Sequence, residues 1–123
     1  MTIKEVSQKM VISADTLRYY ERVGLIPSVK RNKSGIRDYD EEDLRWIQFA
    51  KCMRQSGLSI ESLVEYLKLF LEGEHTCEAR RELLLEEREK LLARIESMNE
   101  TLERLNYKIE NYDKILKQQP PKK

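Results

Sequence analysis

The sequence predicts a mainly α-helical protein, with a small N-terminal helix-turn-helix domain that carries a basic β-hairpin wing and is followed by one long helix. Capped helix signals and glycine breaks alternate over residues 1–73. A basic, turn-rich segment interrupts them after Pro27, and an apolar heptad repeat begins at Leu84. The 37% of charged residues is well above average, as expected for long solvated helices.

The charge is distributed unevenly along the chain. Residues 1–58 hold 11 Lys/Arg against 8 Asp/Glu, although the net charge of the whole chain is only +1. This excess is weaker than is usual for nucleic-acid binders, so charge alone does not establish such a function. The sequence shows neither an 18-residue apolar run nor a secretion signal, which predicts a cytoplasmic protein without membrane contact. Cys52 and Cys77 are expected to be reduced thiols.

Two short helices are predicted at the start of the chain. Thr2 and Glu5 form a capping-box pattern, and the apolar spacing that follows predicts a helix over residues 3–10. Ser13 is the expected N-cap of a second helix, which ends at Gly24. Because a tight turn joins them, the pair has the spacing of a helix-turn-helix, whose second helix enters the major groove.

The second helix has the composition of a contact surface. Within five residues it carries Arg18, Tyr19, Tyr20 and Arg22. Arginine and tyrosine side chains suit a partner that is rich in phosphate oxygens. Since the two tyrosines point about 100° apart on a helix, one is expected to join the core and the other to face the partner; the sequence leaves open which does which.

Residues 27–39 read as the wing, a small hairpin whose loop contains Gly35. It places four cations on about eight residues, and Tyr39 ends the return strand with a hydroxyl that is predicted to meet a phosphate. The alternative is a solvated basic loop. The four cations are Lys30, Arg31, Lys33 and Arg37.

Two supporting helices are predicted next. One is capped by Asp40 and ends near Gly57, and the other starts at Ser59 and is closed by Gly73, with Trp46 as a core or interface anchor. The predicted organisation is a winged helix-turn-helix domain over residues 1–73, a linker over 74–79, a dimerisation helix over 80–117 and a disordered tail over 118–123.

The long helix carries a heptad seam that is interrupted only at Arg88. It spans 33 residues, about 50 Å at 1.5 Å per residue, which a domain of this size cannot cover alone. A homodimer is therefore predicted. The seam residues are Leu84, Leu91, Ile95, Met98, Leu102, Leu105, Ile109, Tyr112 and Leu116.

This arrangement resembles the MerR family of transcriptional regulators, through the string Leu17-Arg-Tyr-Tyr-Glu21, the pair Gly24-Leu25 and the wing pattern Gly35-x-Arg37-x-Tyr39. The resemblance implies a homodimer with an antiparallel coiled coil that binds a pseudo-palindromic promoter element in double-stranded DNA. It also implies that the dimer distorts the long spacer so that RNA polymerase reads both hexamers. By the same resemblance, the DNA-binding residues are Ser13, Thr16, Arg18, Tyr19, Tyr20, Arg31, Arg37, Tyr39 and Arg54.

The segment around Cys52 resembles the aldehyde- and electrophile-responsive NmlR/AdhR-like branch, whose sensing cysteine lies at this point of the helix. Lys51 and Arg54 flank Cys52 within one turn and are expected to favour its reactive thiolate. One alternative is a buried, inert thiol at this position. Another is a metal-responsive regulator that uses Cys77, although only His75 lies near it as a second soft ligand.

No catalytic constellation is apparent in the sequence. It has one histidine and neither a glycine-rich phosphate loop nor a Ser/His/Asp set, so neither an enzyme nor a cofactor is expected, and no metal ligands are assigned. The alternative to a DNA-binding regulator is a coiled-coil adaptor that binds protein partners through the basic wing.

Overall fold

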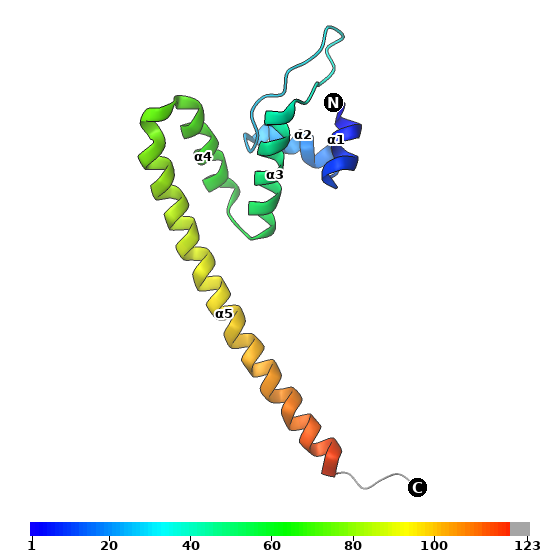
Figure 1. Cartoon of the computed structure of the whole chain (residues 1–123), viewed down its shortest axis with the longest axis vertical. Coiled ribbons are helices and arrows are strands. Elements are labelled where there is room, and N and C mark those ends of the chain that lie inside the picture. Colours follow the sequence, from blue (N-terminus) through cyan, green and yellow to red (C-terminus); the bar gives the residue numbers. More distant parts are fainter. Residues whose placement is uncertain (119–123) are drawn as a thin grey trace. The chain divides into compact units, whose positions relative to one another are not determined.

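The computed structural model describes residues 1–118, and this part of the chain is mainly helical, which confirms the predicted class (Figure 1). It divides into two compact units, Met1–Glu87 and a second unit that begins at Arg88. The elements in chain order are α1 (Ile3–Met10), α2 (Ala14–Val23), α3 (Glu41–Gln55), α4 (Ile60–Glu72), the 3-10 turn η1 (Glu74–Thr76) and α5 (Cys77–Gln118).

Helices α1 and α2 begin at the predicted caps. The Thr2 hydroxyl accepts a hydrogen bond from the Glu5 backbone N–H at 3.2 Å, and the Glu5 carboxylate accepts one from the Thr2 N–H at 3.0 Å. The Ser13 hydroxyl accepts from the Thr16 N–H at 3.1 Å. Between the two helices, Val11 takes a left-handed conformation (φ 54°) that stops α1 and turns the chain into α2. The predicted helix-turn-helix is therefore present.

The core of the first unit gathers side chains from each early element. Val6, Leu17, Ile26 and Ile47 are fully buried. Burying one such side chain contributes about 1.5–3 kcal/mol. Gly24, at φ 88°, ends α2 in the left-handed region, and the next residues, Leu25 and Ile26, are buried. The glycine break thus returns the chain to the core.

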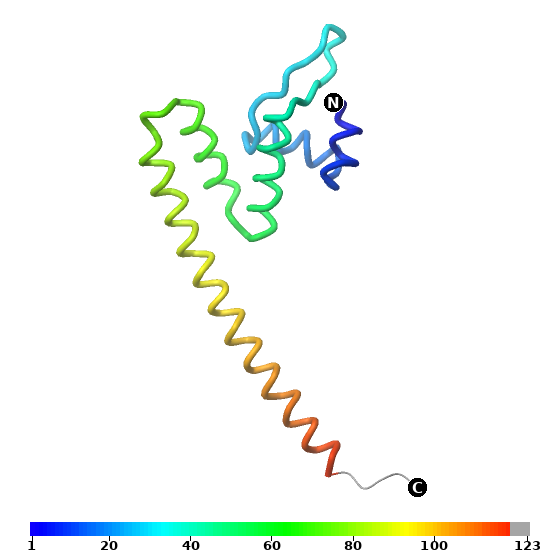
Figure 2. The backbone as a smooth tube through the Cα atoms, viewed as in Figure 1, coloured from blue at the N-terminus to red at the C-terminus, as the bar shows by residue number. Residues whose placement is uncertain are grey.

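The wing is a loop that runs out and back between α2 and α3 (Figure 2). Within the described residues it contains one isolated antiparallel bridge, between Arg31 and Arg37, and no strand, so the predicted β-hairpin is not confirmed. Two backbone hydrogen bonds join its arms, from the Asn32 N–H to the Ile36 carbonyl at 2.8 Å and from the Asp38 N–H to the Lys30 carbonyl at 2.7 Å. At the turn, the Asn32 Oδ1 also accepts from the N–H groups of Ser34 (2.9 Å) and Ile36 (3.1 Å). The two arms are therefore paired as in a hairpin, but over too few residues to form a strand.

An aromatic cluster joins α3 to α4. The Trp46 ring lies 5.0 Å from that of Phe70 and 6.1 Å from that of Tyr66, centroid to centroid. The Phe49 ring completes the cluster at 5.5 Å from Tyr66. Edge-to-face and offset pairs at these separations are favourable beyond their buried area. Trp46 therefore serves as the predicted anchor.

Helix α5 begins within the segment predicted as a linker. The turn η1 takes up part of residues 74–79, and the Thr76 hydroxyl donates to the Leu69 carbonyl at 2.6 Å. Buried Glu87 accepts a hydrogen bond from the Ser62 hydroxyl at 2.6 Å, which ties the first part of α5 to α4 and explains why the first unit extends to Glu87. The division at residue 73 stays a prediction, and the predicted tail, apart from Gln118, lies outside the described residues. None of the helices within residues 1–118 combines the length and the apolar composition that a membrane-spanning helix needs.

Candidate nucleic-acid interface

The N-terminus of α2 presents two of the predicted contact residues together. The hydroxyls of Ser13 and Thr16 share a hydrogen bond of 2.7 Å, and Ser13 is exposed. A helix N-terminus carries partial positive charge from unpaired N–H groups, so this end of α2 favours an anionic partner. The Ser13 hydroxyl that caps α2 is therefore also part of a polar surface that suits an anionic partner.

Arg18 lies one turn further along α2 with its side chain about half exposed. Its Nη1 forms an ion pair with the Asp15 Oδ1 at 2.9 Å, and the Asp15 side chain is 96% exposed. An exposed pair of this kind contributes at most about 1 kcal/mol. A phosphate oxygen can therefore replace the Asp15 carboxylate at small cost.

The two tyrosines of α2 have different surroundings. Tyr20 is 7% exposed and packs in the core with Leu17, and this burial raises the pKa of its phenol. Tyr19 is only partly buried, and the Arg22 guanidinium lies 5.4 Å from its ring centroid. Tyr19 is thus the more accessible of the pair; the contact of either with DNA stays a prediction.

A surface hollow of about 570 Å³ brings four predicted contact residues together: Thr16, Tyr19, Tyr20 and Arg54. Two cations at this hollow are held by backbone carbonyls. The Lys51 Nζ donates to the Met10 carbonyl at 2.7 Å, and the Arg54 Nη1 donates to the Leu58 carbonyl at 2.7 Å. Lys51 is not among the residues predicted for this surface, and in the sequence only its position three residues before Arg54 points to it. The full lining is Val11, Ile12, Thr16, Tyr19, Tyr20, Lys51, Arg54, Gln55 and Ile60.

The two wing arginines are held differently. The exposed Arg31 donates from Nη1 to the Gly35 carbonyl at 2.8 Å, within the turn itself. The Arg37 Nε donates to the Glu21 Oε1 at 2.7 Å, and both of these side chains are largely buried. Arg37 is therefore fixed to α2, through an ion pair that spans 16 residues and that no local sequence pattern indicates.

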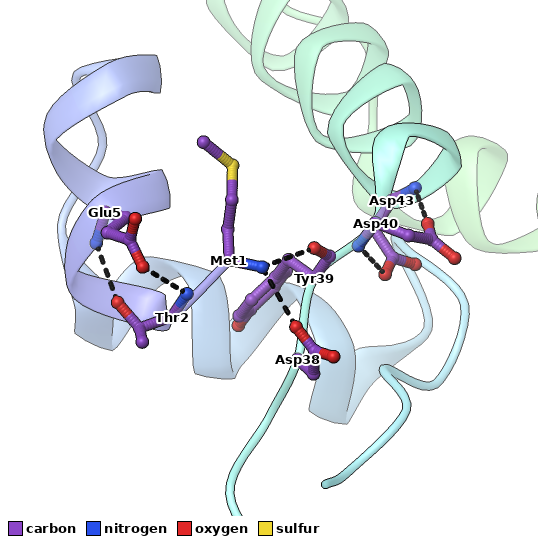
Figure 3. A network of polar contacts seen from close by, with 7 residues as sticks. All are labelled: Met1, Thr2, Glu5, Asp38, Tyr39, Asp40 and Asp43. Atoms are coloured by element: carbon purple, nitrogen blue, oxygen red, sulfur yellow. Dashed lines mark hydrogen bonds and ion pairs between the residues drawn. The ribbon is translucent and has the colours of Figure 1, made fainter.

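Tyr39 is enclosed rather than exposed. Its side chain is 2% exposed, and its Oη has no hydrogen-bond partner within residues 1–118. Burial raises the pKa of its phenol. The backbone around it is paired: the Met1 amino group donates to the Tyr39 carbonyl at 2.8 Å and forms an ion pair with Asp38 at 2.9 Å (Figure 3). The predicted contact between the hydroxyl and a phosphate stays a prediction.

Both cysteines are exposed, so the alternative of a buried thiol at Cys52 does not hold for this structure. The cation contact expected at Cys52 is found instead at Cys77, where the Arg80 Nη2 lies 3.0 Å from the sulfur. Lys51 and Arg54 direct their hydrogen bonds to backbone carbonyls. Within the described residues, no three His, Cys, Asp or Glu side chains are grouped so as to hold a metal ion.

The chain is similar to regulators of known sequence. The AdhR regulator of Bacillus subtilis is 61% identical over 92 residues, which cover 75% of this chain and 66% of the relative, and ZntR of Escherichia coli is 35% identical over 90 residues, 72% of this chain and 64% of the relative. The chain thus matches about two thirds or less of the length of these curated relatives.

Solved structures agree in fold over most of the chain. A MerR family transcriptional regulator from Listeria monocytogenes superposes with a TM-score of 0.90 at 59% identity, covering 92% of this chain and 86% of that one. HiNmlR, a MerR family regulator lacking the sensor domain and bound to promoter DNA, superposes with a TM-score of 0.84 at 29% identity, covering 95% and 93%.

The family model described as MerR HTH family regulatory protein matches residues 1–69, and one described as MerR, DNA binding matches residues 44–107. The relatives named above are transcriptional regulators, which confirms the expectation that the chain is not an enzyme. The resemblance identified from the sequence is also confirmed. The chain belongs to the MerR family of helix-turn-helix regulatory proteins.

Proposed function

We propose that this protein is a transcription regulator that binds promoter DNA as a homodimer and responds to reactive aldehydes or thiol oxidants through Cys52. The proposal of DNA binding rests on one surface, which extends from the N-terminus of α2 to Arg54. It combines a helix N-terminus, the exposed cation Arg18 and a hollow edged by Lys51 and Arg54. Such a surface suits phosphate oxygens, which supply most of the affinity of DNA-binding proteins. HiNmlR, which shares the fold, is bound to promoter DNA.

Dimerisation is assigned to α5 as an antiparallel coiled coil. From Ile95 to Leu116 the proposed seam residues are between 45% and 70% exposed in the single chain. A row of apolar side chains of this length on one helix is a surface that soluble proteins cover. A second copy of the same helix is the simplest cover, since most soluble oligomers are symmetric.

The regulatory step follows from the family resemblance. The dimer is proposed to bind a pseudo-palindromic promoter element and to distort the spacer so that RNA polymerase reads both hexamers. Deforming DNA over 20–30 base pairs costs on the order of 1–6 kcal/mol. Coupling free energies between two sites of a protein are typically about 1–3 kcal/mol, which is of the same order as this cost, so a signal that alters the separation of the two DNA-binding domains is proposed to switch the promoter.

Cys52 is proposed as the sensor because its thiol is exposed on α3, the helix that follows the wing, and because AdhR is 61% identical to this chain over 92 residues. In the reaction with an aldehyde, the Cys52 sulfur adds to the carbonyl carbon, a C–S bond forms, the C=O π bond breaks and the oxygen takes up a proton. With an oxidant such as hydrogen peroxide, the sulfur is oxidised to a sulfenic acid and the peroxide is reduced to water.

The test is transcription in vitro from a promoter obtained by selection of random duplexes with the wild-type protein. Cys52→Ser is expected to bind the promoter with unchanged affinity and to lose activation by formaldehyde or peroxide. Cys77→Ser, the matched control with the other exposed thiol, is expected to respond like the wild type. A Cys52→Ser protein that still responds fully would place the sensor elsewhere.

A further inference from the structure

We propose that Glu21 is a positioning residue, which holds Arg37 so that the free edge of its guanidinium faces a DNA phosphate. This inference rests on the proposed DNA-binding function and assigns a role to an acidic residue on the helix predicted to lie against DNA. A carboxylate at such a surface repels phosphates unless its charge is compensated. The arrangement around Glu21 provides that compensation.

Both carboxylate oxygens of Glu21 are used, one on each side of the wing. Its Oε1 accepts from the Arg37 Nε at 2.7 Å, after the turn, and its Oε2 accepts from the Val29 backbone N–H at 3.1 Å, before the turn. The Glu21 side chain is 15% exposed, so these bonds are shielded from water. One side chain of α2 thus holds both ends of the wing.

The contact leaves the outer part of the Arg37 guanidinium available. Nε is occupied by Glu21, whereas within residues 1–118 the two Nη groups of Arg37 make no hydrogen bond. The guanidinium is rigid and planar, so fixing Nε also sets the direction of the Nη groups. Because the side chain is ordered before DNA arrives, less rotamer entropy is lost on binding.

Arg31 provides an internal comparison on the same wing. It forms the isolated bridge with Arg37, but its guanidinium is exposed and bonds only to the Gly35 carbonyl among the described residues. No acid within residues 1–118 positions it. Because the Gly35 carbonyl, and not Glu21, holds the Arg31 guanidinium, removal of Glu21 is expected to weaken the contact made by Arg37 much more than the contact made by Arg31.

The experiment is a double-mutant cycle on affinity for a duplex selected by the wild-type protein from a random pool. Glu21→Ala and Arg37→Ala are each expected to weaken binding about tenfold, the effect of losing one charged hydrogen bond. The Glu21→Ala/Arg37→Ala double variant is expected to bind no more weakly than Arg37→Ala alone, whereas Glu21→Ala and Arg31→Ala are expected to be additive. Equal losses from Glu21→Ala in the wild-type protein and in the Arg37→Ala variant would overturn the proposal.

Conservative variants separate positioning from folding. Arg37→Lys keeps the charge and can pair with Glu21. Its ammonium lacks the planar guanidinium that can donate to Glu21 on one side and to a phosphate on the other. The Arg37→Lys protein is therefore expected to bind DNA about as weakly as the Arg37→Ala protein. Arg31→Lys is expected to lose less than about threefold. If Glu21→Ala fails to fold, as judged by circular dichroism, Glu21→Gln takes its place in the cycle. Wild-type affinity in Arg37→Lys would overturn the proposal.

Failure of the proposed function gives a different result. A wild-type protein that enriches no duplex from the pool contradicts DNA binding itself, and this inference with it. A wild-type protein that binds its selected duplex but gives an uncoupled cycle contradicts only the role of Glu21.

Discussion

Replacing Tyr39 by phenylalanine tests whether the buried hydroxyl at the end of the wing lacks a hydrogen-bond partner in the folded protein. The Tyr39 ring is buried, and its Oη has no hydrogen-bond partner within the described residues. Burying an unpaired hydroxyl costs about 1–3 kcal/mol. Tyr39→Phe removes that oxygen and keeps the ring, so we expect the free energy of unfolding to rise by about 1 kcal/mol.

Urea unfolding at a fixed protein concentration measures this change, since the stability of a dimer depends on concentration. Tyr107→Phe is the matched control because Tyr107 is 70% exposed, and it is expected to change the free energy of unfolding by less than about 0.5 kcal/mol. A loss of stability in Tyr39→Phe would mean that the hydroxyl has a partner in solution. A loss of DNA affinity alone would mean that the hydroxyl meets a phosphate in the complex, as the sequence predicts.

Tyr39→Phe is also expected to change how the free energy of unfolding depends on pH in alkaline solution. Burial raises the pKa of the Tyr39 phenol, whereas an unfolded tyrosine loses its proton at a pH of about 10. The contribution of the neutral phenol is therefore fully present below about pH 10 and is lost as the pH rises through the raised pKa of the folded state. Wild-type stability should fall more steeply above about pH 10 than that of Tyr39→Phe.

Three further outcomes are expected. Leu102→Glu should leave a monomer in sedimentation experiments, because two like charges would face each other in the proposed seam; an intact dimer would refute the seam assignment. Arg18→Ala should weaken DNA binding and lower the slope of log affinity against log salt by about one, and an unchanged affinity at every salt concentration would place Arg18 in solvent. Val11→Gly should raise the free energy of unfolding by up to about 1 kcal/mol because it relieves the left-handed backbone at φ 54°. Val23→Gly, within α2, should lower it by about 2 kcal/mol, because it removes a side chain that packs against the core as well as adding a glycine to a helix. A destabilised Val11→Gly protein would count against that strain.

The helices were predictable because their signals are local. Thr2, Ser13, Asp40 and Ser59 each cap the helix that follows, through bonds that reach only three residues along the chain. Gly24 and Gly73, at φ 88° and 117°, end α2 and α4 at the predicted breaks. Propensity and spacing are sufficient to place such elements.

The details of the candidate site were not predictable, because they depend on contacts between distant residues. Glu21 meets Arg37 across 16 residues, and Lys51 reaches the Met10 carbonyl across 41. The burial of Tyr39 follows from packing that its position at the end of a basic loop does not reveal. The wing pattern predicts a hairpin, and backbone hydrogen bonds at Asn32 and Asp38 do join its two arms. The pairing is too short to form a strand, and the Asn32 side chain holds the turn.

The most direct test of the central claim is the salt dependence of binding to a fluorescently labelled duplex obtained by random selection. DNA binding through the surface of α2 and the wing predicts that affinity falls by roughly 10³ or more between about 50 and 200 mM salt, as expected for six or more phosphate contacts. A protein that shows no binding to any selected duplex, or a salt-insensitive interaction with a protein partner, would contradict the account and favour a coiled-coil adaptor.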